Sequence, residues 1–186
     1  MKRYLLIIVA LLAAGHVFAV QQNSMLIGGQ LGVRTTNNYY SGTPFRREIV
    51  TIVELYPQWS MFLTENISVD LNVGYHLRKA KVSFEARTSL AAGGRFFYKN
   101  LYGGLELSRE SAWQDVFNPG HTQKYSASYL VPKVGYLAPI KPNIYADLQS
   151  YYKMGIGEYS GDRDGDNRER NFGLRLGILV QLNNKE

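Results

Sequence analysis

The feature that most constrains this chain is a two-residue alternation of apolar and polar side chains, repeated along its length. In the clearest case, residues 67–78, the apolar positions are Ile67, Val69, Leu71, Val73, Tyr75 and Leu77. The intervening positions are Ser68, Asp70, Asn72, Gly74, His76 and Arg78. A strand gathers such residues on one face, whereas a helix scatters them around its circumference. This segment is therefore predicted to be a strand with one apolar and one polar face.

The same alternation recurs in seven further segments, so eight strands are predicted. The seven cover residues 25–34, 51–61, 88–98, 101–111, 128–138, 144–157 and 172–182. Pro57 and Pro132 interrupt two of them. Because proline lacks the N–H that a β-ladder needs, we expect a bulge or a local break in pairing at each.

The connections between these strands alternate in length. Residues 64–66, 99–100 and 140–143 read as tight turns, whereas longer and more polar segments occupy 37–47, 81–87, 115–123 and 158–170. This order places every long loop at one end of an up-and-down meander. Strands of about 10 residues cross a tilted bilayer path, and an even strand count returns both termini to one side. The predicted fold is an all-β, eight-stranded antiparallel transmembrane β-barrel.

The first 19 residues have the features of a secretory signal peptide. Lys2 and Arg3 form a positive start, residues 4–14 are apolar, and Val17-Phe18-Ala19 approximates a small-x-small cleavage site. The alternative is a retained membrane anchor, for which the apolar run is short, since a spanning helix needs roughly 20 apolar residues. We expect cleavage after Ala19, which leaves residues 20–186 as one exported barrel domain.

Composition excludes several classes of protein. The absence of cysteine rules out a disulfide scaffold, a cysteine-ligated zinc site and a thiol nucleophile. Removal of Lys2 and Arg3 lowers the formal net charge from +6 by two, to +4, and the remaining positive residues form no cluster. With export, this argues against a nucleic-acid partner. A mean hydropathy of −0.22 argues against a bundle of transmembrane helices.

The polar face carries charges of both signs among many glycines, which favours an inward orientation. The interior of an eight-stranded barrel is only just wide enough for side chains to fill it. The predicted lumen network consists of Arg34, Glu54, Asp70, His76, Arg78, Arg95, Glu106, Glu110, Lys133, Asp147, Lys153 and Arg175. The alternative is a soluble periplasmic barrel with its apolar face inside, around an apolar ligand.

Aromatic residues on the apolar face fall near the strand ends. Trp59, Tyr98 and Tyr136 lie toward the tight turns, and Tyr75 and Phe172 lie toward the long loops. Two such bands are expected where rings sit at the two lipid–water interfaces. General enrichment of aromatic residues in strands is the simpler explanation.

These features resemble the small eight-stranded outer-membrane barrels of the OmpX/Ail and OmpA transmembrane-domain type. Residues 67–75 (ISVDLNVGY) and 101–107 (LYGGLEL) carry the resemblance, which covers residues 20–186. It implies a Gram-negative outer membrane, contact with lipopolysaccharide, and the barrel-assembly machinery as a partner during insertion. Members usually close on a C-terminal aromatic residue, whereas this chain ends Leu182-Asn-Asn-Lys-Glu186.

Chemistry beyond a structural or surface-interaction role finds little support in the sequence. Some barrels of this size modify lipid A, but neither His76 nor His121 lies in a recognisable nucleophile–base pattern. We therefore predict no catalytic residues and no cofactor.

The polar segment 158–170 contains alternating acidic residues, Asp162, Asp164 and Asp166, that do not match a calcium loop. Its arginines, Arg163, Arg168 and Arg170, are instead predicted to contact lipopolysaccharide phosphates or another extracellular ligand, such as a host protein.

Overall fold

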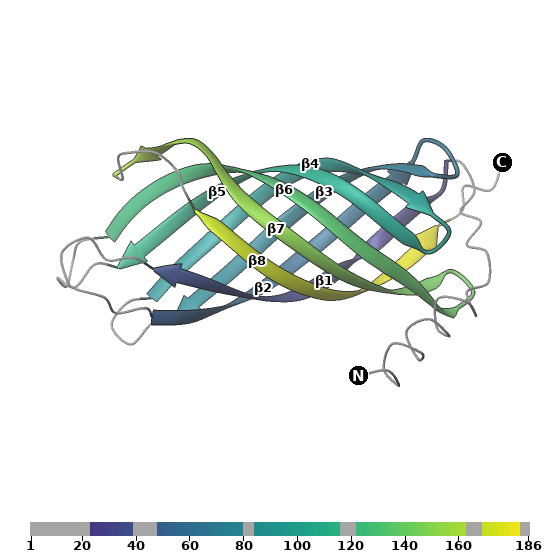
Figure 1. Cartoon of the computed structure of the whole chain (residues 1–186), viewed down its shortest axis with the longest axis horizontal. Helices are drawn as coiled ribbons and strands as arrows, with labels where there is room; N and C mark the ends of the chain where they lie inside the picture. Colours follow the sequence, from purple (N-terminus) through teal and green to yellow (C-terminus); the bar gives the residue numbers. More distant parts are fainter. Residues whose placement is uncertain (1–22, 39–47, 80–83, 116–121, 163–168, 183–186) are drawn as a thin grey trace, which may run out of the picture.

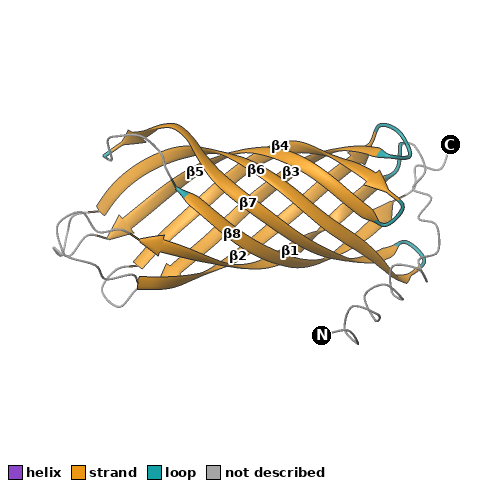
Figure 2. Cartoon of the chain, in the orientation of Figure 1, coloured by secondary structure: helices purple, strands orange, loops and turns teal. Residues whose placement is uncertain are grey.

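A computed structural model describes residues 23–38, 48–79, 84–115, 122–162 and 169–182, and its regular structure is entirely β (Figures 1 and 2). The strands are β1 (Met25–Asn38), β2 (Glu48–Phe62), β3 (Ile67–Lys79), β4 (Phe84–Tyr98), β5 (Leu101–Asp115), β6 (Thr122–Lys141), β7 (Ile144–Gly161) and β8 (Arg170–Leu182). They form a closed barrel in chain order, with every neighbour antiparallel, including β8 with β1. The predicted eight-stranded meander barrel is confirmed. The predicted signal peptide lies outside the described residues.

The described residues include no helix long and apolar enough to span a bilayer.

The register fixes the dimensions of the barrel. Following paired residues once around from Arg34 leads through Gly173, Tyr151, Lys133, Gly104, Arg95, Ser68 and Phe62. The Phe62 amide donates to the Ser24 carbonyl at 3.0 Å, so the path returns to the first strand ten residues away (34 minus 24). Eight strands with this stagger tilt by about 40° and enclose a backbone radius of about 8 Å. Figure 1 shows this tilt.

Each strand presents its apolar side chains outward and its ionic side chains inward. Leu31, Leu105 and Leu176 are 63%, 51% and 60% exposed, whereas Glu54, Asp70 and Asp147 are fully buried. In β8 the alternation is unbroken from Arg170 to Leu182. This arrangement suits hydrocarbon outside and a narrow polar interior, and it contradicts the alternative of a soluble barrel with an apolar centre.

The strands are longer than predicted at the end where the long loops lie. Residues 84–87 belong to β4, residues 122–123 to β6 and residues 158–161 to β7, although each was predicted to be loop. The polar sequence caused the error, because a ladder above the bilayer needs no apolar outer face. At the other end the turn between β6 and β7 is also shorter than predicted, since β6 runs to Lys141, which pairs with Ile144.

Both prolines break the pairing on one side only, as the sequence analysis expected. Pro57 keeps its place opposite Gly29 on β1, but pairing with β3 skips from Leu55 to Gln58. Pro132 pairs with Leu105 on β5, while pairing with β7 skips from Leu130 to Lys133. The register is the same on either side of each gap, so each proline removes ladder contacts without forming a bulge.

The aromatic residues predicted at the interfaces lie on the outer surface. Trp59, Tyr75, Tyr98 and Phe172 are 36%, 44%, 69% and 55% exposed, and Tyr136 is partly buried. Tyr98 pairs with Leu101, which in turn pairs with Tyr136, so these two rings share one level near the tight turns. Tyr152, which the prediction omitted, pairs directly with Phe172 near the other end. Their role at the lipid interface remains a prediction.

The outward orientation predicts how the barrel responds to a charge on its surface. Leu176→Lys places an ammonium group in the middle of the apolar belt and should destabilise the inserted barrel by about 2–4 kcal/mol. Ile140→Lys, beside the turn, should cost at most about 1 kcal/mol. Guanidinium unfolding of both variants in lipid vesicles measures the difference, and equal effects would contradict the membrane-facing assignment.

Candidate functional site

Paired ionic side chains point into the interior of the barrel. The structure buries eleven of the twelve predicted lumen residues, each 5% exposed or less: Arg34, Glu54, Asp70, His76, Arg95, Glu106, Glu110, Lys133, Asp147, Lys153 and Arg175. Arg78 lies on β3, where it pairs with Ile52 of β2 and Glu85 of β4, but its side chain lies outside the described part of the structure.

Toward the tight turns, Asp70 contacts two cations and shares one of them with Glu106. The Arg95 Nε lies 2.8 Å from Asp70 Oδ2, and Lys133 Nζ lies 3.2 Å from the same oxygen. Lys133 also contacts Glu106 Oε2 at 3.1 Å. Because each carboxylate is held by groups from other strands, the contacts connect β3, β4, β5 and β6 across the lumen.

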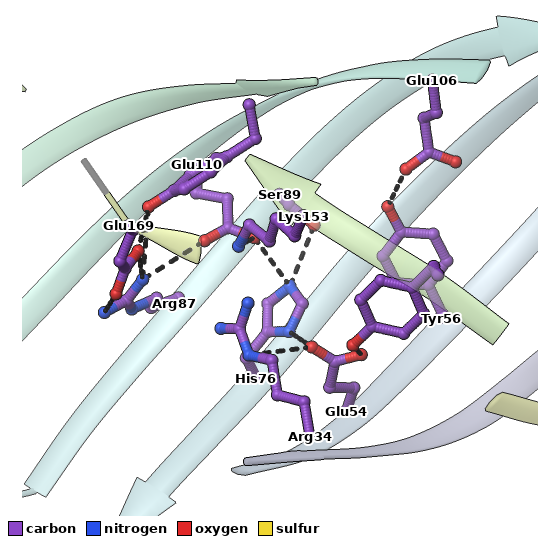
Figure 3. A network of polar contacts seen from close by, with 12 residues as sticks. Arg34, Glu54, Tyr56, His76, Arg87, Ser89, Glu106, Glu110, Lys153 and Glu169 are labelled. Carbon is purple, nitrogen blue, oxygen red and sulfur yellow. Dashed lines mark hydrogen bonds and ion pairs between the residues drawn. The ribbon is translucent and has the colours of Figure 1, made fainter. Parts of the chain in front are cut away.

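In the middle of the barrel, Glu54 contacts four other side chains, several of which are drawn in Figure 3. Its carboxylate lies 3.3 Å from the Nε atoms of both Arg34 and Arg175 and 3.0 Å from His76 Nδ1. The Tyr151 hydroxyl donates to Glu54 Oε2 at 2.6 Å. Three cationic or protonatable groups and a hydroxyl therefore offset the cost of burying this carboxylate.

Toward the long loops, a third group of contacts closes the lumen, and the sequence analysis missed most of it. Arg87 Nε donates to Glu85 Oε1 at 2.6 Å, and Arg87 Nη1 donates to Glu169 Oε2 at 3.1 Å. Lys153 pairs with Glu110, which also lies 3.4 Å from Arg87 Nη1. Glu85, Arg87 and Glu169 were missed because segments 81–87 and 158–170 were predicted to be loops.

Glu169, which immediately precedes β8, is held in its ionised form. Burial alone would raise its pKa, but the Arg87 guanidinium and the Lys153 ammonium lower the pKa of Glu169 well below its ordinary value. The stabilisation from this contact is therefore complete above about pH 5 and is lost only as the pH falls toward the lowered pKa.

Five tyrosine hydroxyls complete the network, each donating to a carboxylate. The pairs are Tyr56–Glu106 at 2.7 Å, Tyr102–Asp147 at 2.7 Å, Tyr151–Glu54 at 2.6 Å, Tyr125–Glu85 at 2.5 Å and Tyr129–Glu169 at 2.5 Å. The Arg175 guanidinium also lies over the rings of Tyr56 and Tyr151, at 3.7 and 4.1 Å from their centroids. Tyrosine therefore supplies bulk and a donor together, which a narrow, charged interior requires.

Glycines opposite these tyrosines provide the space that the rings occupy. A Cβ on Gly173 would lie 2.3 Å from Cζ of Tyr151, and a Cβ on Gly135 would lie 2.3 Å from Cζ of Tyr102. Both glycines are on the inward face, where the sequence shows an excess of glycine. The small residues thus belong to the packing of the lumen.

Below the ionic contacts, an apolar cluster closes the end near the tight turns. It comprises Leu26, Phe62, Phe97, Tyr102, Leu137 and Leu179. The Phe97 ring lies 5.1 Å from Phe62 and 5.3 Å from Tyr102, centroid to centroid. The Arg95 guanidinium covers the Phe97 ring at 5.2 Å, which joins the ionic network to this cluster.

One arrangement in the lumen has the connectivity of a hydrolase triad. The two ring nitrogens of His76 lie 3.0 Å from Glu54 Oε1 and 3.1 Å from Ser89 Oγ (Figure 3). Sequence reasoning found no such pair, because Ser89 and Glu54 lie on strands other than that of His76. Ser89, His76 and Glu54 are 4%, 2% and 0% exposed, and Glu110 also contacts His76 Nε2 at 3.5 Å. An acyl-transfer site needs room for a carbonyl beside its nucleophile and oxyanion donors. These contacts fit a buried hydrogen-bond network better.

The described residues contain no group of three or more side chains suited to hold a metal ion. Of the acidic loop residues, Asp162 accepts a hydrogen bond from the Lys124 amide at 2.8 Å, while Asp164 and Asp166 lie outside the described residues. Arg163, Arg168 and His121 also fall outside them, and Arg170 is exposed at the start of β8. The loop contacts therefore stay predictions.

The Glu54 contacts make a stability prediction. Glu54→Gln removes the charge that neutralises Arg34 and Arg175 in a water-excluded interior, so it should destabilise the barrel by about 3–5 kcal/mol. Glu65→Gln, in an exposed turn, should change stability by less than about 0.5 kcal/mol. Guanidinium unfolding in vesicles compares the two, and a Glu54→Gln barrel as stable as the control would show that the network is dispensable.

Comparison with known proteins finds likeness in fold without close sequence similarity. No protein-family model matches the chain, and no curated protein matches its sequence. Solved structures that resemble the barrel include the following three. Neisserial surface protein A has a TM-score of 0.64 and 15% identity, with 84% of this chain and 96% of that chain covered. OprG of Pseudomonas aeruginosa has a TM-score of 0.59 and 11% identity, with 90% of this chain and 99% of that chain covered. Ail of Yersinia pestis, solved with a heparin analogue, has a TM-score of 0.56 and 16% identity, with 88% of this chain and 100% of that chain covered. The chain has the fold of the small eight-stranded outer-membrane β-barrels.

Proposed function

We propose that this chain is a Gram-negative outer-membrane protein with a structural or surface-interaction role and a plugged lumen. The observation that carries the proposal is the filled interior, in which ionic contacts cross the barrel at three levels and an apolar cluster closes one end. These contacts support a lumen that serves neither as a pore nor as a ligand cavity. The extracellular segments and the outer surface are then left to make functional contacts.

The contacts proposed for this chain are packing against lipopolysaccharide, adhesion, or binding of a host factor. Ail, one of the barrels with the same fold, is solved in complex with the heparin analogue sucrose octasulfate. A highly sulfated sugar and a phosphorylated glycolipid share the chemistry that arginine recognises, namely clustered anionic oxygens. We also propose that residues 1–19 are a signal peptide that directs export and is cleaved after Ala19. The barrel-assembly machinery would then insert the protein into the outer membrane.

The plugged lumen predicts an electrically silent protein. Purified barrel reconstituted in planar bilayers should give no conductance above that of protein-free membranes, because the cross-barrel ion pairs leave no continuous water path. The heat-modifiable shift on a detergent gel confirms that the sample is folded. Discrete, reproducible channel openings from the folded sample would refute the plugged lumen.

We expect the loop arginines to form part of the contact with lipopolysaccharide. The triple variant Arg163→Ala, Arg168→Ala, Arg170→Ala should bind lipopolysaccharide at least several-fold more weakly than the original chain, because arginine pairs with phosphate in a bidentate manner. Pull-down of purified lipopolysaccharide by immobilised barrel measures it, with Lys99→Ala, beside a tight turn, as the matched control. Unchanged binding by the triple variant would exclude these arginines.

We propose no enzymatic activity. The Ser89–His76–Glu54 contacts are buried among charged side chains, away from the outer surface where lipid A lies. Deletion of the gene should therefore leave the mass spectrum of lipid A unchanged. Loss of an acyl or phosphate modification from lipid A in the deletion strain, restored by the wild-type gene but not by a Ser89→Ala gene, would establish a lipid-modifying enzyme.

A further inference from the structure

The outer face of the barrel stops being apolar early on β5 and β6. Along the outward row of β5, Leu105 and Leu107 are 51% and 58% exposed, and the next outward residues are Arg109 and Ser111. On β6 the outward row changes at the same rung, because Ser128 pairs with Arg109. On β5 and β6 the apolar rows therefore end at this rung, while Leu90 of β4 and Ile156 of β7 are the apolar neighbours on either side. This places the Arg109 guanidinium at the boundary between hydrocarbon and headgroups.

Arg109 is held in place by neutral partners. Its Nη1 donates to Ser128 Oγ at 3.0 Å and its Nη2 donates to Ser160 Oγ at 2.8 Å. Ser160 Oγ also lies 3.3 Å from Ser126 Oγ. These partners orient the guanidinium without neutralising its charge, and they use two of its five N–H donors. An oriented, charged guanidinium on an outer surface is suited to an anion.

A hollow lies next to this arginine, and its lining includes Ser160, which accepts a hydrogen bond from Arg109. Its volume is about 350 Å³, and the outward side chains that line it are Ser111, Trp113, Lys124, Ser126 and Ser160. Trp113 is 39% exposed and pairs with Lys124 across β5 and β6, so an indole face and an ammonium group stand side by side at the rim. Apolar ring faces, hydroxyls and a cation are the groups that bind a charged sugar.

An irregularity in β7 shapes the hollow. Ser126 pairs with Ser160 and Ser128 pairs with Ile156, so three residues of β7 lie opposite one residue of β6. Gly157 takes a φ of 69° within this insertion, a conformation that side-chain-bearing residues rarely adopt. Such insertions bend a strand and redirect its side chains, which here brings Ser160 over Arg109.

We propose that the outward hollow between β5 and β7 binds the phosphorylated sugar headgroup of an outer-leaflet lipopolysaccharide molecule, with Arg109 on the phosphate and Trp113 against the sugar ring. The proposal rests on the outer-membrane location proposed above. The position of the site selects this occupant: it faces sideways, at the level where headgroups begin, and the acyl chains would continue down the apolar rows that start at Leu107 and Leu130. A phosphate free in solution would have no reason to occupy a site beside hydrocarbon.

The test is a titration of the folded full-length mature chain in maltoside micelles with bisphosphorylated lipid A, followed by NMR. The chain has two tryptophans, so the indole N–H signal of Trp113 should shift while that of Trp59, toward the opposite end of the barrel, should not. Arg109→Gln should weaken lipid A binding about tenfold or more, since a charge-assisted contact is lost. Trp113→Ala and Lys124→Gln, both exposed, should each weaken it several-fold, and Lys141→Gln is the matched control at the far rim.

Two further probes separate the sources of the anion. Lipid A without phosphates should bind at least tenfold more weakly than the bisphosphorylated form, and inorganic phosphate at the same concentration should leave the Trp113 signal unmoved. Equal shifts from inorganic phosphate would overturn the headgroup assignment. If Arg109→Gln and Trp113→Ala leave the affinity for lipid A unchanged, the proposed site is wrong but the proposed function stands. If the wild-type chain does not bind lipid A at all, the result counts against both.

Discussion

Closure of the β-ladder is the constraint on which the rest of this structure depends, because hydrocarbon offers no partner to an unpaired backbone N–H or C=O group. With eight strands, closure at a ten-residue stagger sets the radius of the barrel and hence the width of its lumen. That width is just enough for side chains from facing strands to meet. The inward residues must therefore satisfy one another, and the sequence meets this demand with mixed charges, tyrosines and opposing glycines.

The lumen network shows how such a demand is met without one dominant ion pair. Burying a charge costs several kcal/mol unless its partners restore the lost hydration. Each described lumen carboxylate contacts more than one donor, and tyrosine hydroxyls supply donors without adding charge. Since the partners come from different strands, only the correct register brings them together. The network then favours a single register as well as balancing charge, a role that buried polar groups fill in other proteins too.

The sequence predicts the faces of the strands better than their partners or their ends. Which side chains point outward and which point inward was predictable, because side chains alternate along a strand. One apolar row therefore fixes the orientation of every residue in the segment. His76 illustrates what was not predictable: its partners Glu54 and Ser89 lie on neighbouring strands, and only the register places them beside its ring. The strand ends were missed for a different reason. Above the bilayer no solvent contrast remains between the two faces, so Arg87 and Glu85 lie in a ladder whose sequence reads as a loop.

Departures from the alternation rule are informative in a chain that obeys it so consistently. The buried carboxylates contact cations and tyrosine hydroxyls from other strands, so their burial is explained within the lumen. Arg109 is different: it occupies a position where Leu105 and Leu107 set the pattern, and its hydrogen bonds are to hydroxyls that are themselves out of place on a lipid-facing row. Local rules are broken most often where function requires it. The Arg109 cation lies at the edge of the hydrocarbon, beside a hollow with Trp113 at its rim. An anionic headgroup would give it the partner of opposite charge that the interior residues find in each other.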